Sequence, residues 1–220
     1  LRDDLDKDYI STTLENIIKY NYLFIGEILY THADKSHGEQ TLRGERYVDP
    51  LQPGTKTFFN ELSRFNIPVM THWEVYNWER DWPRFSKIYS EYRNLKFIIP
   101  HMAFAHPHQV EKILSVHPNV YMTISKKEKD QRSYSDRKKA GKLGPGFLDS
   151  SKILRNSWVL ILDRYQDRLL FATDAHKRAR WKKYRKIIRK YRKILGQLPR
   201  QIAEQIAYKN AAKLYGVIVE

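Results

Sequence analysis

The sequence predicts an α/β fold in which short parallel strands alternate with helices. Two observations support this prediction. Short apolar runs alternate with stretches in which apolar residues recur every three or four positions, the patterns of buried strands and amphipathic helices. Four of the apolar runs also end on a residue that can bind a metal, and the carboxyl ends of parallel strands lie on one side of a sheet.

Five runs are predicted as strands, with helices around and between them. The strands span residues 22–29, 67–71, 95–100, 119–124 and 169–173. The helices span residues 5–20, 55–65, 82–92, 108–116, 151–165, 177–193 and 199–215. Asp81 is the expected N-cap of the third helix, Pro83 lies in its first turn, and Gly216 ends the last helix. Two long connections, 30–54 and 125–150, follow strand ends, where long loops usually serve an active site.

The composition is that of one well-packed domain, which we take to span residues 1–220. The chain is 41% hydrophobic, and no apolar run approaches the roughly 20 residues that a membrane span needs. It contains no cysteine, so a metal would be held by histidine and carboxylate ligands. The first residue is leucine, so we expect that an upstream portion is missing. We predict a soluble, cytoplasmic protein.

Positive charge is concentrated near the carboxyl terminus. The net charge is +15, and residues 177–193 hold eleven lysines or arginines and no acid. Trp181, Tyr184 and further apolar residues recur there at helical spacing, so the cations occupy the other faces of a helix. A surface helix with solvated charges explains this pattern, and a face that binds phosphates or a membrane surface is the alternative. Residues 125–150 are also basic, and a basic loop over a metal would favour an anionic substrate. A disordered surface excursion is the alternative interpretation of this segment.

Glu27, His72, His101 and Asp174 are the candidate metal ligands. His72, His101 and Asp174 each directly follow a predicted strand, and Glu27 lies in the last part of another, so the four side chains should converge on one side of the sheet. Nitrogen and oxygen ligands suit zinc, with manganese or iron as alternatives, and a metal activates water near neutral pH. Asp174 is expected to serve as both ligand and catalytic base. A buried histidine held by a hydrogen bond is the structural alternative for His72 and His101.

Three further residues are candidates for substrate binding. His32 lies in the connection after the first strand, Trp73 directly follows His72, and Lys126 follows the strand at 119–124. Lys126 in that position would bind a carboxylate or a phosphate. The alternatives are an exposed loop histidine at position 32, helix-to-sheet packing at position 73 and a solvated cation at position 126.

At these residues the sequence resembles the amidohydrolase superfamily, especially its amidohydrolase-related branch, with a local similarity to TatD-like hydrolases at residues 26–28. The runs that end at His72, His101 and Asp174 resemble its fifth, sixth and eighth strands, and residues 210–216 resemble its closing helix. The resemblance implies a (β/α)8 TIM-like barrel with metal ligands at several strand ends. This chain would hold strands 4–8 of that barrel and their helices, with strands 1–3 missing.

The sequence departs from the superfamily at the first strand, whose His-x-His metal ligands are absent. His106-Pro107-His108 has the same spacing, but it follows the sixth strand and opens a helix, so we do not assign that role to it. We expect that a missing amino-terminal segment carries strands 1–3 and two more histidines. If the chain is instead complete, its open sheet edge would need a partner, such as a second copy in a homo-oligomer.

The resemblance implies a metal-dependent hydrolase that uses metal-activated water to attack a carbonyl-type substrate. A small, anionic molecule is the expected substrate class. Three alternatives stay open: a decarboxylase on the same scaffold, a TatD-like phosphodiesterase or nuclease that binds nucleic acid, and a non-catalytic scaffold that has lost its first-strand ligands.

Overall fold

The computed structural model describes residues 5–36, 43–128, 143–175 and 178–218. Its centre is a five-stranded sheet in the order β1-β4-β5-β6-β7, in which every neighbouring pair is parallel. The strands are β1 (Ile25–Leu29), β4 (Val69–His72), β5 (Phe97–Ile99), β6 (Val120–Thr123) and β7 (Leu169–Leu170). The α/β class and the five parallel strands predicted from the sequence are therefore confirmed.

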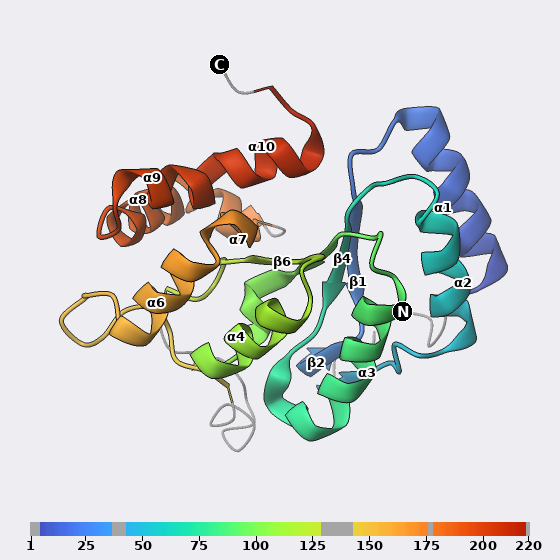
Figure 1. Cartoon of the computed structure of the whole chain (residues 1–220), viewed down its shortest axis with the longest axis horizontal. Coiled ribbons are helices and arrows are strands. Elements are labelled where there is room, and N and C mark those ends of the chain that lie inside the picture. The colour runs from blue at the N-terminus through green and yellow to red at the C-terminus, as the bar shows by residue number, and fades with distance from the viewer. Residues whose placement is uncertain (1–4, 37–42, 129–142, 176–177, 219–220) are drawn as a thin grey trace.

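Helices follow the strands and cover the sheet. Figure 1 shows α1 to α3 on the β1 side of the molecule, and α4 with the helices from α6 onward on the β6 side. The α-helices are α1 (Lys7–Tyr20), α2 (Pro53–Leu62), α3 (Trp78–Glu91), α4 (Pro107–Val116), α6 (Asn156–Arg164), α7 (Arg178–Trp181), α8 (Tyr184–Leu195), α9 (Arg200–Glu204) and α10 (Asn210–Tyr215). Single turns of 3-10 helix span Val75–Asn77 and Gln166–Arg168, and a π-helical turn spans Gln205–Lys209. The segment Pro100–Phe104 forms a turn that contains left-handed backbone.

The start of α3 differs from the prediction. The helix begins at Trp78, so Asp81 lies in its first turn and is not the N-cap. Asp81 is fully buried and accepts hydrogen bonds from the guanidinium of Arg80 at 2.6 and 3.1 Å, which satisfies its carboxylate inside the helix. Pro83 accordingly lies inside the helix instead of near its first residue.

Two other predicted helices also differ. The helix predicted from residue 151 begins at Asn156. Asp149 explains the delay, because its Oδ1 accepts the backbone N–H groups of Ser151 and Ile153 at 2.8 and 3.0 Å and holds a turn there. The basic segment forms two helices, α7 and α8, instead of one. Gly216 ends α10 in the left-handed conformation (φ 66°), as predicted.

Residues 30–54, predicted as a long connection, contain an antiparallel hairpin. Its strands are β2 (Thr31–Ser36) and β3 (Arg43–Tyr47). The Val48 N–H donates to the carbonyl oxygen of Tyr30 at 2.7 Å, which ties the base of the hairpin together. His32 therefore lies on a strand, and its interpretation as a loop residue is wrong.

The connection at 125–150 is described only at its two ends. Lys127 is buried there, and its Nζ donates to the carbonyl oxygens of Ala105 and Gly144 at 3.2 and 3.3 Å. A Cβ on Gly144 would lie 2.0 Å from the Ala105 oxygen, so only glycine allows this close approach. Residues 129–142, which carry most of the predicted basic segment, lie outside the described residues.

Successive strand residues face two separate cores, as the two-residue period of a strand requires. Phe97 and Ile99 of β5 lie in the main core, which the helices cover. Ile98 between them packs instead with Leu170 of β7 and Leu214 of α10. The sheet is therefore buried on both faces, which explains why its strands read as nearly continuous apolar runs.

The two edges of the sheet differ. At β7, the Phe171 N–H donates to the carbonyl oxygen of Ile206 at 2.9 Å, and Asn210 Nδ2 donates to the carbonyl oxygen of Leu169 at 2.7 Å. The carboxyl-terminal helices thus occupy the hydrogen-bonding groups of this edge. The other edge is β1. The last turn of α1 and the residues between α1 and β1 expose several large hydrophobic side chains, namely Ile18, Tyr20, Tyr22, Leu23 and Phe24.

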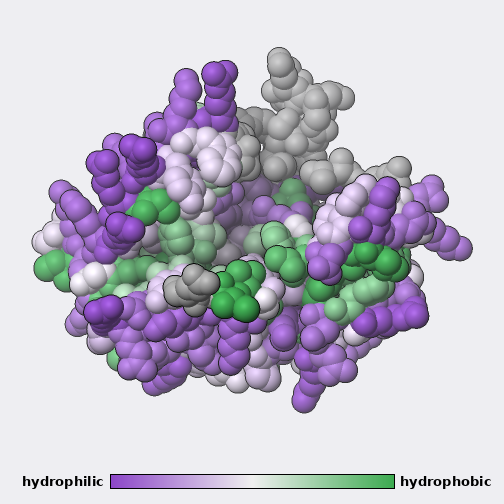
Figure 2. Space-filling model, turned by 90° about the horizontal axis from the view of Figure 1, so that it is seen from above, coloured by the Kyte–Doolittle hydropathy of each residue, from purple (hydrophilic) through white to green (hydrophobic). Residues whose placement is uncertain are grey.

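The molecular surface is mostly hydrophilic, with hydrophobic side chains in patches across the middle of the face shown in Figure 2. Among the described residues, no helix combines the length and the hydropathy needed to cross a membrane.

Candidate metal centre

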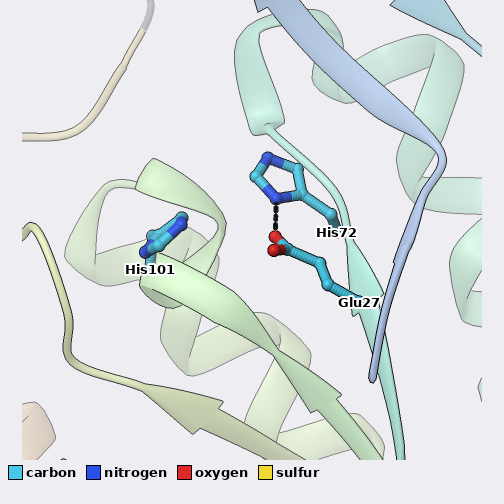
Figure 3. A group of neighbouring side chains, drawn as sticks. All are labelled: Glu27, His72 and His101. Atoms are coloured by element: carbon cyan, nitrogen blue, oxygen red, sulfur yellow. Dashed lines mark hydrogen bonds and ion pairs between the residues drawn. The ribbon is translucent and has the colours of Figure 1, made fainter. Parts of the chain in front are cut away.

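Glu27, His72 and His101 meet at the carboxyl ends of three neighbouring strands. Glu27 lies on β1, His72 ends β4, and His101 follows β5 (Figure 3). One ligand atom from each side chain lies within 4.8 Å of those of the other two, close enough for all three to share one ion. The two imidazoles are buried, whereas the Glu27 side chain is 39% exposed, so the site opens towards solvent on the β1 side.

An unusual backbone turn positions His101. Residues His101 to Phe104 all have positive φ, between 48° and 57°, and form a left-handed turn that is entirely buried. Left-handed backbone costs energy in residues other than glycine, and such strain concentrates at functional sites. The His101 N–H donates to Thr123 Oγ1 at 3.0 Å, and Nδ1 lies 2.8 Å from Ser125 Oγ. β6 and the residues after it therefore fix both the backbone and the ring of His101.

The three side chains differ in charge. Burial alone would lower the pKa of His72, but hydrogen bonds to Glu27 and Glu74 outweigh it and raise the pKa to about 9. Burial, together with the positive charges of His72 and Lys126, lowers the pKa of His101 to about 3. Burial would raise the pKa of Glu27, yet the hydrogen bond and charge of His72 bring it below its usual value. At neutral pH, Glu27 is therefore anionic, His72 cationic and His101 neutral.

Asp174, the fourth predicted ligand, lies nearby but outside this group of three. It follows β7 with φ 50°, and its Oδ2 forms an ion pair with Nζ of Lys126, which follows β6 with φ 58°. The negative charge of Asp174 still reaches the centre, because it partly opposes the lowering of the pKa of both Glu27 and His101. Lys126, the predicted substrate-binding residue, thus lies close to the centre. Its partner is the carboxylate of Asp174, which was predicted to bind the metal.

Glu74 is part of the centre and was missed in the sequence. Its side chain is fully buried, and Oε1 lies 3.2 Å from His72 Nε2 and 3.7 Å from His32 Nε2. The imidazoles of His32 and His72 stack, with ring centroids 5.4 Å apart. Glu74, His32 and His72 thus form a second group whose ligand atoms lie within 4.8 Å. The two-residue step from His72 to Glu74, which puts both on one side of an extended chain, was the available signal.

Trp73 lies away from solvent in an aromatic stack. It is fully buried, and its ring stacks on those of Trp78, Trp82 and Phe85 at centroid distances of 5.8, 6.3 and 4.6 Å. Trp73 was expected to bind substrate, and its buried position corrects that expectation. Its ring packs between α3 and the sheet, which was the structural alternative.

The sequence matches a model of the amidohydrolase family over residues 31–217. No curated protein matches it significantly.

Solved structures share the fold at low sequence identity. A protein from Pseudomonas putida assigned as a 2-pyrone-4,6-dicarboxylic acid hydrolase has 13% identity and a TM-score of 0.62, over 100% of this chain and 71% of that one. A protein of the same assignment from Acinetobacter baumannii, with citric acid bound, has 12% identity and a TM-score of 0.58, over 98% and 71%. The 2,6-dihydroxybenzoate decarboxylase from Rhizobium has 14% identity and a TM-score of 0.55, over 94% and 67%. An uncharacterised protein from Bordetella bronchiseptica, with a TM-score of 0.59, is a TIM barrel, so the parallel sheet corresponds to part of such a barrel.

Proposed function

We propose, from the premise that this chain belongs to the amidohydrolase family, that it is a metal-dependent enzyme acting on a small carboxylate substrate. The observation that carries the proposal is the convergence of Glu27, His72 and His101, whose ligand atoms lie within 4.8 Å of one another at the strand ends. In barrels and open sheets of parallel strands, this is the side on which active sites lie. A cytoplasmic location remains a prediction from the sequence.

The donor atoms fit a divalent cation. Glu27 offers an anionic carboxylate, and burial keeps His101 neutral, the form in which imidazole binds metals. His72 would have to lose its proton, and its imidazole would then be oriented by Glu74. The mixture of nitrogen and oxygen donors suits zinc, manganese or iron. When bound, such an ion supplies Lewis acidity and lowers the pKa of water to near neutrality.

Asp174 and Lys126 supply the remaining chemistry. The Asp174 carboxylate is the expected base, because it is only partly exposed and lies close enough to influence both Glu27 and His101. It would take a proton from the attacking water and return it to the leaving group. Lys126 can exchange its ion pair with Asp174 for one with a substrate carboxylate, since its side chain remains 30% exposed. Lys126 would thereby fix the orientation of an anionic substrate.

Two reactions fit these residues. Hydrolysis of a carbonyl-type bond uses Asp174 as the base, and decarboxylation would require the substrate carboxylate to lie at the centre. The structural neighbours are named for both reactions, a 2-pyrone-4,6-dicarboxylic acid hydrolase and a 2,6-dihydroxybenzoate decarboxylase. Their likeness to this chain shows the fold alone, so their substrates are starting points for assays.

Metal content is the first test. Elemental analysis of the purified full-length protein should find zinc, manganese or iron in near-stoichiometric amount, and this content should fall in His101→Ala and Asp174→Asn. His108→Ala, which changes an exposed histidine outside the centre, is the control and should retain the metal. The loaded protein is then assayed on 2-pyrone-4,6-dicarboxylate and 2,6-dihydroxybenzoate. A full-length protein that neither contains a metal nor takes one up would leave only the non-catalytic scaffold.

A further inference from the structure

Helices α7 and α8, with the two residues between them, carry a dense cationic surface. Figure 1 shows α8 at the end of the molecule opposite α1 and α2, and α7 nearer the middle. We call this surface the cationic face, and it consists of eight exposed residues: Arg178, Lys182, Lys183, Arg185, Lys186, Arg189, Arg192 and Lys193. Within the described part of the chain, none of the eight forms an ion pair with a carboxylate, and Lys190 beside them pairs with Glu128 at 3.5 Å. The positive charge of this face is therefore not neutralised by neighbouring acids in those parts of the chain.

The two sides of α8 are sharply divided. At about 100° per residue, its cations occupy one half of the helix circumference and its apolar residues the other. The apolar half is already used, because Tyr191, Ile194 and Leu195 are buried in the main core. An amphipathic helix that binds a membrane needs a free apolar face, and most of the apolar half of α8 is covered by the core. This arrangement favours a hydrophilic polyanion over a lipid surface.

The cations are also close enough to repel one another. Arg185, Arg189 and Arg192 follow each other at steps of four and three residues, so their side chains are neighbours on the helix surface. Like charges at these spacings destabilise a helix, and a partner with regularly spaced negative charges would relieve the repulsion. The phosphate backbone of a nucleic acid has this property.

Two exposed aromatic rings lie next to the cationic face. Trp181 is 60% exposed and Tyr184 is 38% exposed, and their rings stack with centroids 5.4 Å apart and planes 15° apart. Proteins that bind single-stranded nucleic acids combine a cationic track for the backbone with exposed aromatic rings on which bases stack. In a duplex the bases are already stacked on each other, so a free aromatic platform favours a single strand.

We propose that the cationic face binds single-stranded nucleic acid, with phosphates on α8 and a base stacked on Trp181 and Tyr184. The cationic face shares no residue with the candidate metal centre, and the proposal concerns binding of the nucleic acid alone.

The test is binding of a fluorescein-labelled oligo-uridylate, followed by fluorescence anisotropy over a range of salt concentrations. The charge-reversal variant Arg185→Glu/Arg189→Glu/Arg192→Glu is compared with Lys87→Glu/Lys112→Glu/Lys213→Glu, which makes the same change in net charge at exposed sites on α3, α4 and α10. Each lost phosphate contact should lower the slope of log affinity against log salt by about 0.7, so the α8 variant should lose about 2 in slope. The control should keep most of the wild-type slope.

The aromatic contribution is tested separately. Trp181→Ala should weaken binding by about tenfold without changing the salt slope, because it removes stacking and not charge. Tyr20→Ala, at another exposed ring on α1, should bind as the wild type does. Circular dichroism and metal uptake show whether each variant is folded.

Three outcomes would overturn the proposal. The first is that the wild type binds the oligonucleotide no more tightly than the α8 variant does. The second is that the two triple variants lose equal affinity, which would show an effect of net charge without a specific site. The third is that anionic phosphatidylserine vesicles bind more tightly than the oligonucleotide and depend on the same three arginines, which would make the surface a membrane contact.

Discussion

Lys126 and Asp174 form an ion pair across the carboxyl ends of β6 and β7, and both residues have left-handed backbone conformations (φ 58° and 50°). Lys126, which was expected to bind substrate, thus pairs with Asp174, which was expected to act as the base. The pair also places a cation next to the candidate metal centre, where it contributes to the low pKa of His101. Metal binding and substrate binding should therefore respond in opposite directions to the loss of Lys126.

Lys126→Gln should tighten metal binding and weaken substrate binding. Removal of the ammonium frees Asp174 and removes a positive charge that repels a divalent cation, so the dissociation constant for zinc should fall. The same change removes the partner of the substrate carboxylate, so KM should rise about tenfold or more, the usual cost of a charge-assisted hydrogen bond. Competition with a chelator and steady-state kinetics measure the two effects. Lys87→Gln, at an exposed site on α3, should change neither, and parallel changes in both constants would contradict the assignment.

The elements that place these residues were largely predictable, whereas their contacts were not. The apolar runs before His72 and His101 have the length and continuity of buried parallel strands, and both imidazoles lie where those runs predict. Glu74 was missed because a glutamate is normally a surface residue, and only the fold shows that its buried carboxylate lies beside two imidazoles, those of His72 and His32.

Backbone conformation was the least predictable feature. Nothing in the sequence His101 to Phe104 indicates a left-handed turn, since glycine is the usual residue there and none is present. The β2–β3 hairpin was missed for a related reason, because its first strand reads as polar and lacks the alternation of a half-buried strand.

Metal affinity should increase with pH up to about 9, because His72 holds a proton in the metal-free protein below that value. Its pKa is raised, so the proton stays bound at neutral pH and a metal must displace it. The apparent affinity should therefore rise about tenfold per pH unit and then level off. Calorimetric titration with zinc in buffers of different ionisation enthalpy should detect the release of one proton at neutral pH. No proton release would contradict ligation by His72.

Glu74→Gln should weaken metal binding by about 10–100-fold, the usual effect of removing the carboxylate that supports a metal-binding imidazole. The comparison is made above pH 9, because at lower pH the loss of the Glu74 charge also makes His72 easier to deprotonate and offsets the effect. Chelator competition gives the affinities. Glu79→Gln, an exposed glutamate five residues further along, should match the wild type. Equal affinities for the two variants would show that Glu74 does not support the centre.

The left-handed turn after β5 makes Ala103 sensitive to the shape of its side chain. Ala103 is fully buried with φ 53°. Ala103→Gly relieves backbone strain but loses a buried methyl group worth about 0.8 kcal/mol, so stability should change by less than about 1 kcal/mol. Ala103→Val adds a β-branched side chain to left-handed backbone in a packed core and should destabilise the protein by about 3 kcal/mol or more.

Urea denaturation measures both variants of Ala103. Ala212→Val, at a half-buried position in the right-handed helix α10, is the matched control and should cost less than about 1.5 kcal/mol. Equal destabilisation by the two valine substitutions would show that the turn is not left-handed in solution.

His117 should make the protein less stable at mildly acidic pH. It is 2% exposed, its Nε2 lies 2.9 Å from Ser86 Oγ, and burial, with a smaller contribution from the charge of Arg93, lowers its pKa from 6.5 to about 4. Because the pKa is depressed in the folded state, the neutral ring stabilises the protein fully above about pH 6.5. As the pH falls from there towards 4, the unfolded state binds a proton that the folded state does not, and this stability is lost.

The pH dependence is isolated by comparison with His117→Gln, which keeps a polar group near Ser86 but does not titrate. Urea denaturation at a series of pH values should show that the difference in unfolding free energy between wild type and variant is constant above about pH 6.5 and shrinks as the pH falls towards 4. Other titrating groups, His101 included, are present in both proteins and cancel in this difference. A difference that stays constant over the whole range would mean that His117 has the same pKa in the folded and unfolded states.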